Sequence, residues 1–185
     1  MASKLKVGII LGSTREGRVS PQVGAWVKAQ ADKRDDAFYE IVDIKDYKLP
    51  LLGESDDMSG IMKWNEKLAS LDAFVFVVSE YNRSISGALK NALDSAKDAW
   101  HNKASGIVSY GSAGGARASE HLRGILSELQ VASVRSHTLL SLFTDFEDGS
   151  VFKPSSMHLG NLNTMLDQVQ LWGKALKTAR DSKVE

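Results

Sequence analysis

Short apolar runs alternate with amphipathic stretches along the whole chain. The runs are rich in β-branched and aromatic residues, which predicts strands over 6–11, 38–44, 73–78, 106–109 and 131–140. Apolar residues recur with helical spacing between and after these runs, which predicts helices over 23–31, 61–71, 88–99, 119–129 and 159–179. Residues 145–157 follow neither pattern, and we expect a surface loop or excursion there, before the last helix.

The repeated strand–helix alternation predicts the α/β class, with a parallel sheet covered by helices on both faces. The run 73–78 (AFVFVV) is apolar on both faces and predicts a central strand, whereas 38–44 (FYEIVDI) alternates and predicts a half-exposed one. Right-handed crossovers and the chain length favour a flavodoxin-like three-layer sandwich with five strands in the order 2-1-3-4-5. No repeat, low-complexity tract or linker divides the chain, so a single domain over 1–185 is predicted.

Composition narrows the function classes. The chain has 23 Lys and Arg against 23 Asp and Glu, and this balance argues against a nucleic-acid partner. The longest apolar runs are too short to span a membrane, and the start of the chain has no signal-peptide pattern, so a cytoplasmic location is expected. The absence of cysteine excludes disulfides and thiolate metal sites. No metal site is expected, since metal-ligand spacing is lacking among the four histidines: His101, His121, His137 and His158.

Ligands of such sheets bind outside the carboxyl ends of the strands, so the segment after the first strand is the first candidate. It reads GSTREGRVS over 12–20, with hydroxyls, two arginines and a following helix N-terminus, which together indicate a phosphate site. A turn with Ser20 as N-cap and Pro21 in the first helical turn is the simpler interpretation, and both can hold. Arg18 and Val19 stand where a P-loop has Lys and Ser or Thr, so a phosphate monoester fits better than a triphosphate.

Two further polar segments end at the same edge of the predicted sheet. After the third strand, Tyr81 and Asn82 offer a stacking face and amide hydrogen bonds to a planar heterocycle, although a polar turn capped by Ser86 explains the segment equally well. After the fourth strand, YGSAGGAR over 110–117 contains three glycines and lets the backbone approach a flat ligand closely.

These motifs resemble the NAD(P)H-dependent FMN reductase family of the flavodoxin-like superfamily, which includes quinone, azo-dye and chromate reductases. The resemblance rests on LGSTR over 11–15, EYN over 80–82 with GALKNALD over 87–94, and SYG over 109–111 with GGAR over 114–117. It implies an FMN enzyme that takes hydride from NAD(P)H in a ping-pong cycle and reduces a quinone, free flavin, azo dye or similar small acceptor. It also implies a homodimer or homotetramer, and no obligatory catalytic acid or base, since the flavin does the chemistry.

By this resemblance, the FMN phosphate would be held by Ser13, Arg15 and Ser20, with Arg18 and Val19 lending backbone or charge. The isoalloxazine would lie, mostly through main-chain contacts, against Glu80, Tyr81, Asn82 and Arg83. Its other edge would lie along Ser109, Gly111 and Gly114.

The chain departs from the family pattern at Ser79 and Ser86, where proline is usual, at Ser95, where tryptophan is common, and at Arg83, where the usual residue is smaller. Three alternatives therefore stand beside the reductase. A non-catalytic flavodoxin-type electron carrier would favour a strongly acidic surface, and this chain is neutral. A receiver-type signalling domain needs acidic residues where the first and third strands end, and Leu11-Gly12 and Val78-Ser79 stand there. A flavin-fold relative with impaired activity is the third.

Overall fold

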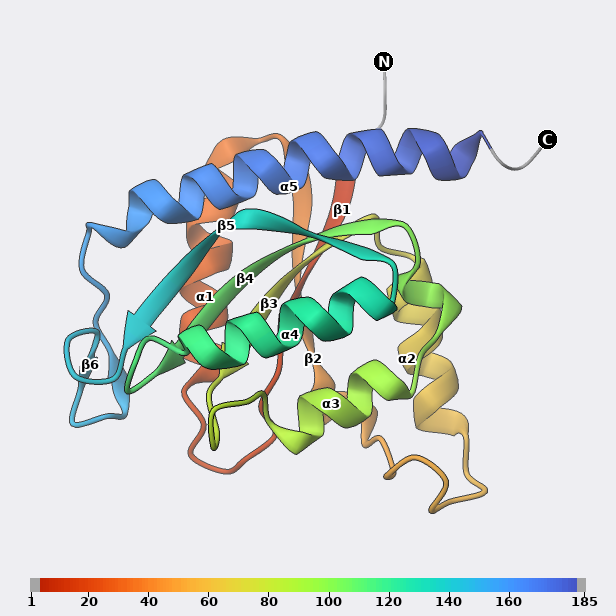
Figure 1. Ribbon diagram of the computed structural model, residues 1–185, viewed down its shortest axis with the longest axis horizontal. Helices are drawn as coiled ribbons and strands as arrows, with labels where there is room; N and C mark the ends of the chain where they lie inside the picture. The colour runs from red at the N-terminus through yellow and green to blue at the C-terminus, as the bar shows by residue number, and fades with distance from the viewer. Residues whose placement is uncertain (1–3, 183–185) are drawn as a thin grey trace.

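Five parallel strands form the centre of the computed structural model, which describes residues 4–182 (Figure 1). The sheet has the order β2-β1-β3-β4-β5, as predicted. Its strands are β1 (Leu5–Leu11), β2 (Ala37–Asp43), β3 (Ala73–Ser79), β4 (Lys103–Gly111) and β5 (Val131–Ser141). The helices are α1 (Ser20–Ala31), α2 (Ser59–Ala69), α3 (Gly87–Asp94), α4 (Ala116–Glu128) and α5 (His158–Asp181). No helix among the described residues is long and apolar enough to cross a bilayer.

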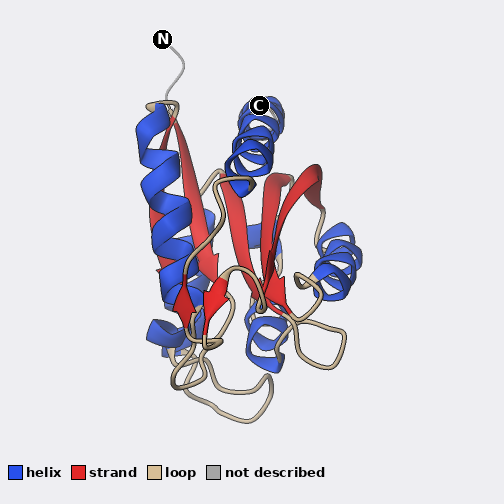
Figure 2. Cartoon of the chain, turned by 90° about the vertical axis from the view of Figure 1, so that its left-hand side faces the viewer, coloured by secondary structure: helices blue, strands red, loops and turns tan. Residues whose placement is uncertain are grey.

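Helices cover the sheet on both sides (Figure 2). Alternate residues of each strand point to opposite faces, so β1 sends Val7 and Ile9 to the core beneath α1 and α5 and Ile10 to the core beneath α2, α3 and α4. β3 lies between β1 and β4, and every one of its residues is buried. Its position explains why its sequence is apolar on both faces.

Three short 3₁₀ turns and a hairpin lie between the main elements. The turns are η1 (Asp32–Arg34), η2 (Ile44–Tyr47) and η3 (Asp98–Trp100). The segment 145–157, expected as a loop or excursion, contains the hairpin of β6 (Phe146–Glu147) and β7 (Val151–Phe152). Asp145 ties this excursion to the sheet, because its carboxylate accepts hydrogen bonds from the Ser141 N–H (2.8 Å) and lies 2.7 Å from Nε2 of His158.

Several predicted elements differ in extent from the observed ones: α1 and α4 each begin three residues before the predicted start, and two elements differ further. The fourth strand was expected over 106–109 but begins at Lys103, because the buried polar residues Lys103 and Ser105 interrupt the apolar pattern while still pairing with β3 and β5. The third helix was expected over 88–99 but ends at Asp94, and η3 follows as a separate turn. The prediction of one domain over 1–185 stays a prediction, since residues 1–3 and 183–185 lie outside the described part.

Lys103 is the buried cation of the sheet and generates a prediction about stability. Its Nζ donates to the Leu68 carbonyl (2.6 Å) and lies 5.5 Å from the centre of the Phe74 ring, while burial lowers its pKa to about 8. The unfolded chain therefore binds more protons than the folded one between about pH 8 and 10.5, so this lysine lowers stability below that range and the penalty disappears above it.

We expect Lys103→Met to raise the free energy of unfolding by about 2 kcal/mol at pH 7. The Leu68 carbonyl keeps a partner in the Leu71 N–H, so little is lost with the ammonium. Urea unfolding of both proteins at several pH values measures the effect. The advantage of the variant should shrink as the pH rises toward 10.5, and a difference that is independent of pH would contradict this explanation.

Candidate functional site

Three loops meet at the carboxyl edge of the sheet, after β1, β3 and β4. The Gly12 N–H donates to the Val77 carbonyl (2.9 Å), which joins the first loop to β3. The Glu80 N–H donates to the Tyr110 carbonyl (2.9 Å), which joins the second loop to β4. A cavity of about 360 Å³ opens between the first two loops, and it is lined by Ser13, Thr14, Arg15, Tyr81, Ser86, Gly87 and Ala88.

The β1–α1 loop presents main-chain donors that the protein itself does not use. Among the hydrogen bonds of the described residues, none is donated by the main-chain N–H groups of Ser13, Thr14, Arg15, Val19 or Ser20. The loop can approach β3 this closely because it starts at Gly12, where a Cβ atom would lie 2.9 Å from the Val77 carbonyl oxygen. Unpaired N–H groups ahead of a helix N-terminus form an anion site.

The start of α1 differs from the simple capping interpretation. Ser20 is the first helical residue rather than the N-cap, Val19 occupies the cap position, and no side chain caps the helix. The Ser20 Oγ is buried and has no hydrogen-bond partner among the described residues. Pro21 in the first turn removes one donor that would otherwise need an acceptor. The Ser20 hydroxyl is therefore left with hydrogen-bonding capacity at the helix end.

Arg15 and Tyr81 connect two of the predicted segments. Nε of Arg15 donates to the Tyr81 hydroxyl (2.9 Å), and Nη1 donates to the Glu16 carbonyl (2.8 Å). Arg15 forms no salt bridge with a described residue, so no carboxylate among residues 4–182 neutralises its positive charge. The structure thus brings Ser13, Arg15 and Tyr81 to one cavity.

Arg18 lies in the same loop, but protein acceptors engage its side chain. Its guanidinium forms a bidentate pair with the Asp43 carboxylate (2.7 and 2.5 Å) and also donates to the Ser13 carbonyl. Both side chains of the pair are mostly buried. Both terminal nitrogens of Arg18 are thus used by protein acceptors, which leaves its main chain and Nε for a ligand. Asp43 was missed by sequence analysis, although its place at the carboxyl end of the neighbouring strand was a signal for it.

A tight turn after β3 carries Asn82 and Arg83. The turn is closed by reciprocal main-chain hydrogen bonds between Tyr81 and Ser84 (2.9 and 2.8 Å), and both central residues have positive φ, 47° for Asn82 and 65° for Arg83. Ser86 caps α3, as the turn interpretation predicted, by accepting from the Leu89 N–H (3.2 Å). Non-glycine residues in this conformation are costly and often mark functional sites.

Arg83 is separated from the cavity that holds Arg15. It lines another hollow, of about 380 Å³, with Ala116, Arg117, Glu120 and His121. Arg83 was predicted to lie against the isoalloxazine together with Tyr81, and the two residues line different cavities. His121 borders this second hollow, and its Nδ1 lies 3.0 Å from the Ser84 hydroxyl.

Glu80 anchors the second loop to α4. Its carboxylate pairs with the Arg117 guanidinium and accepts from the main-chain N–H groups of Arg117 (3.2 Å) and Ala118 (3.4 Å). Burial alone would raise the pKa of Glu80, but these hydrogen bonds outweigh it and hold the pKa below its ordinary value. Glu80 therefore stays ionised at neutral pH and neutralises the positive end of α4, so its side chain is structural.

The glycine loop after β4 is shaped by Ser109 and by two residues in the left-handed region. The Ser109 hydroxyl donates to the Gly114 carbonyl (2.9 Å), and Gly114 (φ 66°) is followed by Gly115 (φ 74°). The Gly111 carbonyl accepts from the N–H groups of Gly114 (3.1 Å) and Leu142 (3.0 Å). These hydrogen bonds hold the loop close to the carboxyl ends of β4 and β5.

Within residues 4–182, no cluster of three or more His, Asp or Glu side chains could hold a metal ion.

Comparisons with known proteins agree with this geometry. A family model described as NADPH-dependent FMN reductase matches residues 5–145. An NAD(P)H-dependent FMN reductase of Saccharomyces cerevisiae is 32% identical over 145 residues, which cover 69% of this chain and 76% of that protein. A quinone reductase of Escherichia coli strain K12 is 33% identical over 134 residues, covering 68% of this chain and 71% of that protein. The chain belongs to the NADPH-dependent FMN reductase family.

A solved structure supports the same fold. The flavoenzyme FerB of Paracoccus denitrificans, an NAD(P)H:(acceptor) oxidoreductase, superimposes with a TM-score of 0.74 at 18% identity and covers 90% of this chain and 97% of its own. Membership of the FMN reductase family confirms the resemblance drawn from the three loop motifs. It also confirms the expectation of an oxidoreductase that depends on FMN and NAD(P)H.

Proposed function

We propose that this FMN reductase family member holds FMN at the β1–α1 loop and reduces small acceptors with NAD(P)H. The observation that carries the proposal is the row of unpaired main-chain N–H groups at Ser13, Thr14, Arg15, Val19 and Ser20. A phosphate monoester supplies the acceptor oxygens that these donors lack.

The side chains around the loop fit this group. The Ser20 Oγ is buried without a partner and offers one more hydrogen bond. Arg15 carries an uncompensated charge for the phosphate, whereas Arg18 positions the loop through Asp43. Tyr81 and the positive-φ Asn82 present a ring and main-chain groups to the flat heterocycle. Gly111 and Gly114 provide the opposite edge, with Ser109 holding the loop in place.

The proposed reaction needs little acid–base chemistry from the protein. Bound FMN supplies two-electron redox chemistry. For a quinone acceptor the overall reaction is NAD(P)H plus a proton plus quinone giving NAD(P)⁺ plus quinol. The proton comes from solvent, and the protein's part is to orient both substrates and exclude water. A free flavin or an azo dye is an alternative acceptor of the same electrons.

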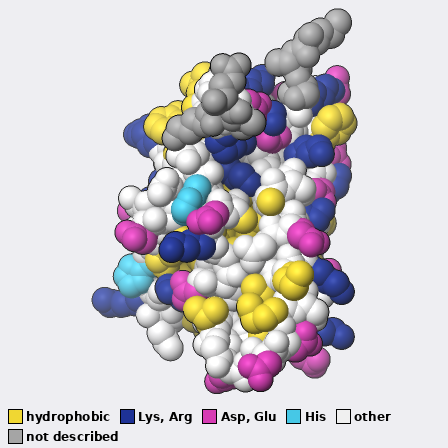
Figure 3. Space-filling model, turned by 90° about the vertical axis from the view of Figure 1, so that its right-hand side faces the viewer, with side chains coloured by type: hydrophobic (Ala, Val, Ile, Leu, Met, Phe, Trp, Pro, Cys, Tyr) yellow, Lys and Arg dark blue, Asp and Glu magenta, His cyan; other side chains and the backbone are white. Residues whose placement is uncertain are grey.

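We also propose a homodimer or homotetramer and a cytoplasmic location, where NAD(P)H is available. Hydrophobic side chains gather on the lower part of one face of the molecule (Figure 3). Exposed apolar residues of α2 and the segment before it include Leu52, Met58 and Met62, which are 60%, 47% and 60% exposed. Exposed apolar groups of this kind are typical of subunit contacts. Sedimentation equilibrium gives the assembly size, and a monomer at micromolar concentration would contradict the proposed assembly.

Steady-state kinetics test the proposed activity. With the FMN-loaded protein, initial rates at several NADPH and quinone concentrations should give parallel double-reciprocal lines, because the first product, NADP⁺, leaves before the quinone binds. Intersecting lines would contradict the ping-pong order. The absence of NADPH- or NADH-dependent quinone reduction would contradict the proposed activity itself.

The role of Arg15 is tested with two flavins. We expect Arg15→Ala to weaken FMN binding by about tenfold and to leave riboflavin binding unchanged, because only FMN carries the phosphate. Quenching of flavin fluorescence measures both affinities. Arg135→Ala is the matched control, because Arg135 is exposed on β5 and should not affect either flavin. Equal losses for FMN and riboflavin would show that Arg15 does not contact the phosphate.

A further inference from the structure

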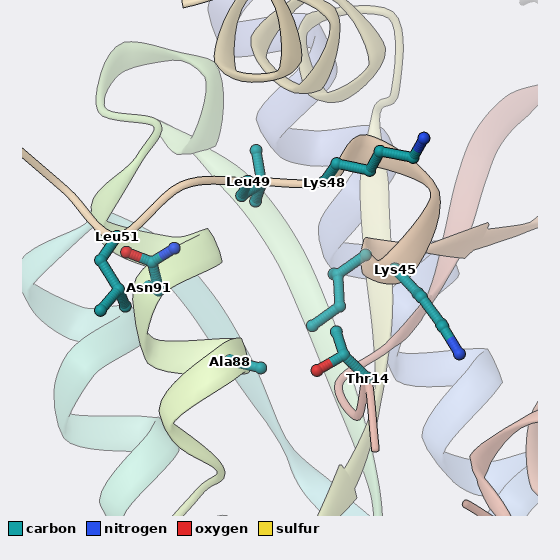
Figure 4. Close-up of a pocket in the computed structure, with 8 residues that line it drawn as sticks. Thr14, Lys45, Lys48, Leu49, Leu51, Ala88 and Asn91 are labelled. Carbon is teal, nitrogen blue, oxygen red and sulfur yellow. The ribbon is translucent and has the colours of Figure 1, made fainter. Parts of the chain in front are cut away.

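A second cavity adjoins the proposed flavin site. It has a volume of about 550 Å³ and lies between η2, the segment that follows it, and α3 (Figure 4). Thr14 and Ala88 line both this cavity and the smaller one beside Arg15 and Tyr81. A molecule in the larger cavity would therefore lie directly against the β1–α1 loop. We name it the η2–α3 pocket.

The walls of the η2–α3 pocket are mainly aliphatic. Ile44, Leu49, Leu51 and Ala88 form them, and Leu51 is 57% exposed, so a bound ring would cover apolar surface that now meets water. Asn91 holds the wall in place, because its amide donates to the Pro50 carbonyl (2.8 Å) and accepts from the Leu52 N–H (3.0 Å). An apolar, preformed pocket of this kind suits a planar aromatic molecule.

Two lysines line the pocket, Lys45 and Lys48, and neither forms a salt bridge within residues 4–182. Lys45 forms no salt bridge with a described residue, unlike Lys67 and Lys90 of the neighbouring helices. Asp43, two residues before Lys45, is already paired with Arg18 and accepts only from the main-chain N–H of Lys45 (3.0 Å). Asp46, the next residue, forms no salt bridge with Lys45 either. In the close-up, the Lys45 side chain runs down to the level of Thr14, and its nitrogen lies at the outer edge of the pocket, on the far side of Thr14 from Leu51 and Asn91 (Figure 4).

Lys48 has a different position. Its side chain extends away from Thr14 in the same view (Figure 4). It also borders a neighbouring cavity of about 310 Å³ whose lining includes the carboxylates Asp46 and Asp57. The cation that serves the η2–α3 pocket is therefore Lys45.

We infer that the η2–α3 pocket binds the acceptor and that Lys45 selects aromatic acceptors with an anionic substituent, such as a sulfonate, a carboxylate or an ionised hydroxyl. The aliphatic walls hold the ring, and the ammonium group of Lys45 pairs with the charge at the pocket mouth. This inference rests on the proposed function for its redox step, in which the acceptor quinone gains two electrons and two protons from NAD(P)H and solvent.

Binding without turnover is the first test. The probe is naphthalene-2-sulfonate, with the neutral naphthalene-2-sulfonamide for comparison, titrated into the FMN-loaded protein and followed by calorimetry. Lys45→Ala should weaken sulfonate binding by about three- to fivefold, Lys45→Arg should retain it, and sulfonamide binding should not change. High salt should remove the preference for the sulfonate. Sulfonate binding that is the same in Lys45→Ala and the unmodified protein would overturn the inference.

Turnover is the second test. For Lys45→Ala, kcat/KM should fall about three- to fivefold for 1,4-naphthoquinone-2-sulfonate and stay unchanged for 2-methyl-1,4-naphthoquinone. Lys174→Ala is the control, because Lys174 is an exposed lysine of α5, on the other side of the sheet. A changed preference for NADPH over NADH, with acceptor preference unaltered, would assign Lys45 to the donor and overturn the inference. If the unmodified protein reduces no quinone, the proposed function fails, and the calorimetric test still decides the anion preference of the pocket.

Discussion

The burial of β1 and β3 side by side is the constraint on which the rest of the structure depends. Both strands are apolar on both faces and must be covered by helices on each side, so their ends and the loops that follow are held at one edge. Beyond Gly12, whose N–H donates to β3, the loop after β1 has no strand partner among the described residues for its N–H groups, and it runs into a helix whose first turn is uncapped. The same packing that stabilises the sheet therefore leaves a set of donors for an anionic ligand.

The ion pair of Arg18 and Asp43 connects the β1–α1 loop to the end of β2. It fixes the β1–α1 loop from one side, and the Asp43 carboxylate also caps η2 by accepting from the main-chain N–H of Lys45. A single carboxylate thus positions both the loop proposed to hold FMN and the turn that carries Lys45. Because both partners are mostly buried, removing one would leave the other charge without compensation, and the two neighbouring pockets would lose their common support.

Strand order and the three loop motifs could be predicted from the sequence because each depends on local pattern. The AFVFVV run of β3 requires burial on both faces, and glycine and hydroxyl residues mark the ends of β1 and β4. The side-chain pairs could not be predicted in this way. Arg18 was expected to lend backbone or charge to a phosphate, and the sequence did not indicate that Asp43, 25 positions further along, engages its side chain. The segment after β2 was not predicted to belong to the site, although β2 ends beside β1 in the sheet. Ser20 was misplaced by one position at the start of α1, since an uncapped helix has no local signal for its first residue.

The central claim is that the main-chain donors of the β1–α1 loop bind the phosphate of FMN, and phosphorus-31 NMR tests it most directly. The phosphate of free FMN changes its ionisation near pH 6, so its resonance moves between about pH 5 and 8. In the complex, the N–H groups of the loop and Arg15 should hold the dianion, because hydrogen bonds to the charged form lower its pKa. We expect a bound resonance whose position does not change over this range. A bound flavin whose phosphorus resonance titrates as in free FMN would show that the phosphate lies in solvent and would contradict the account.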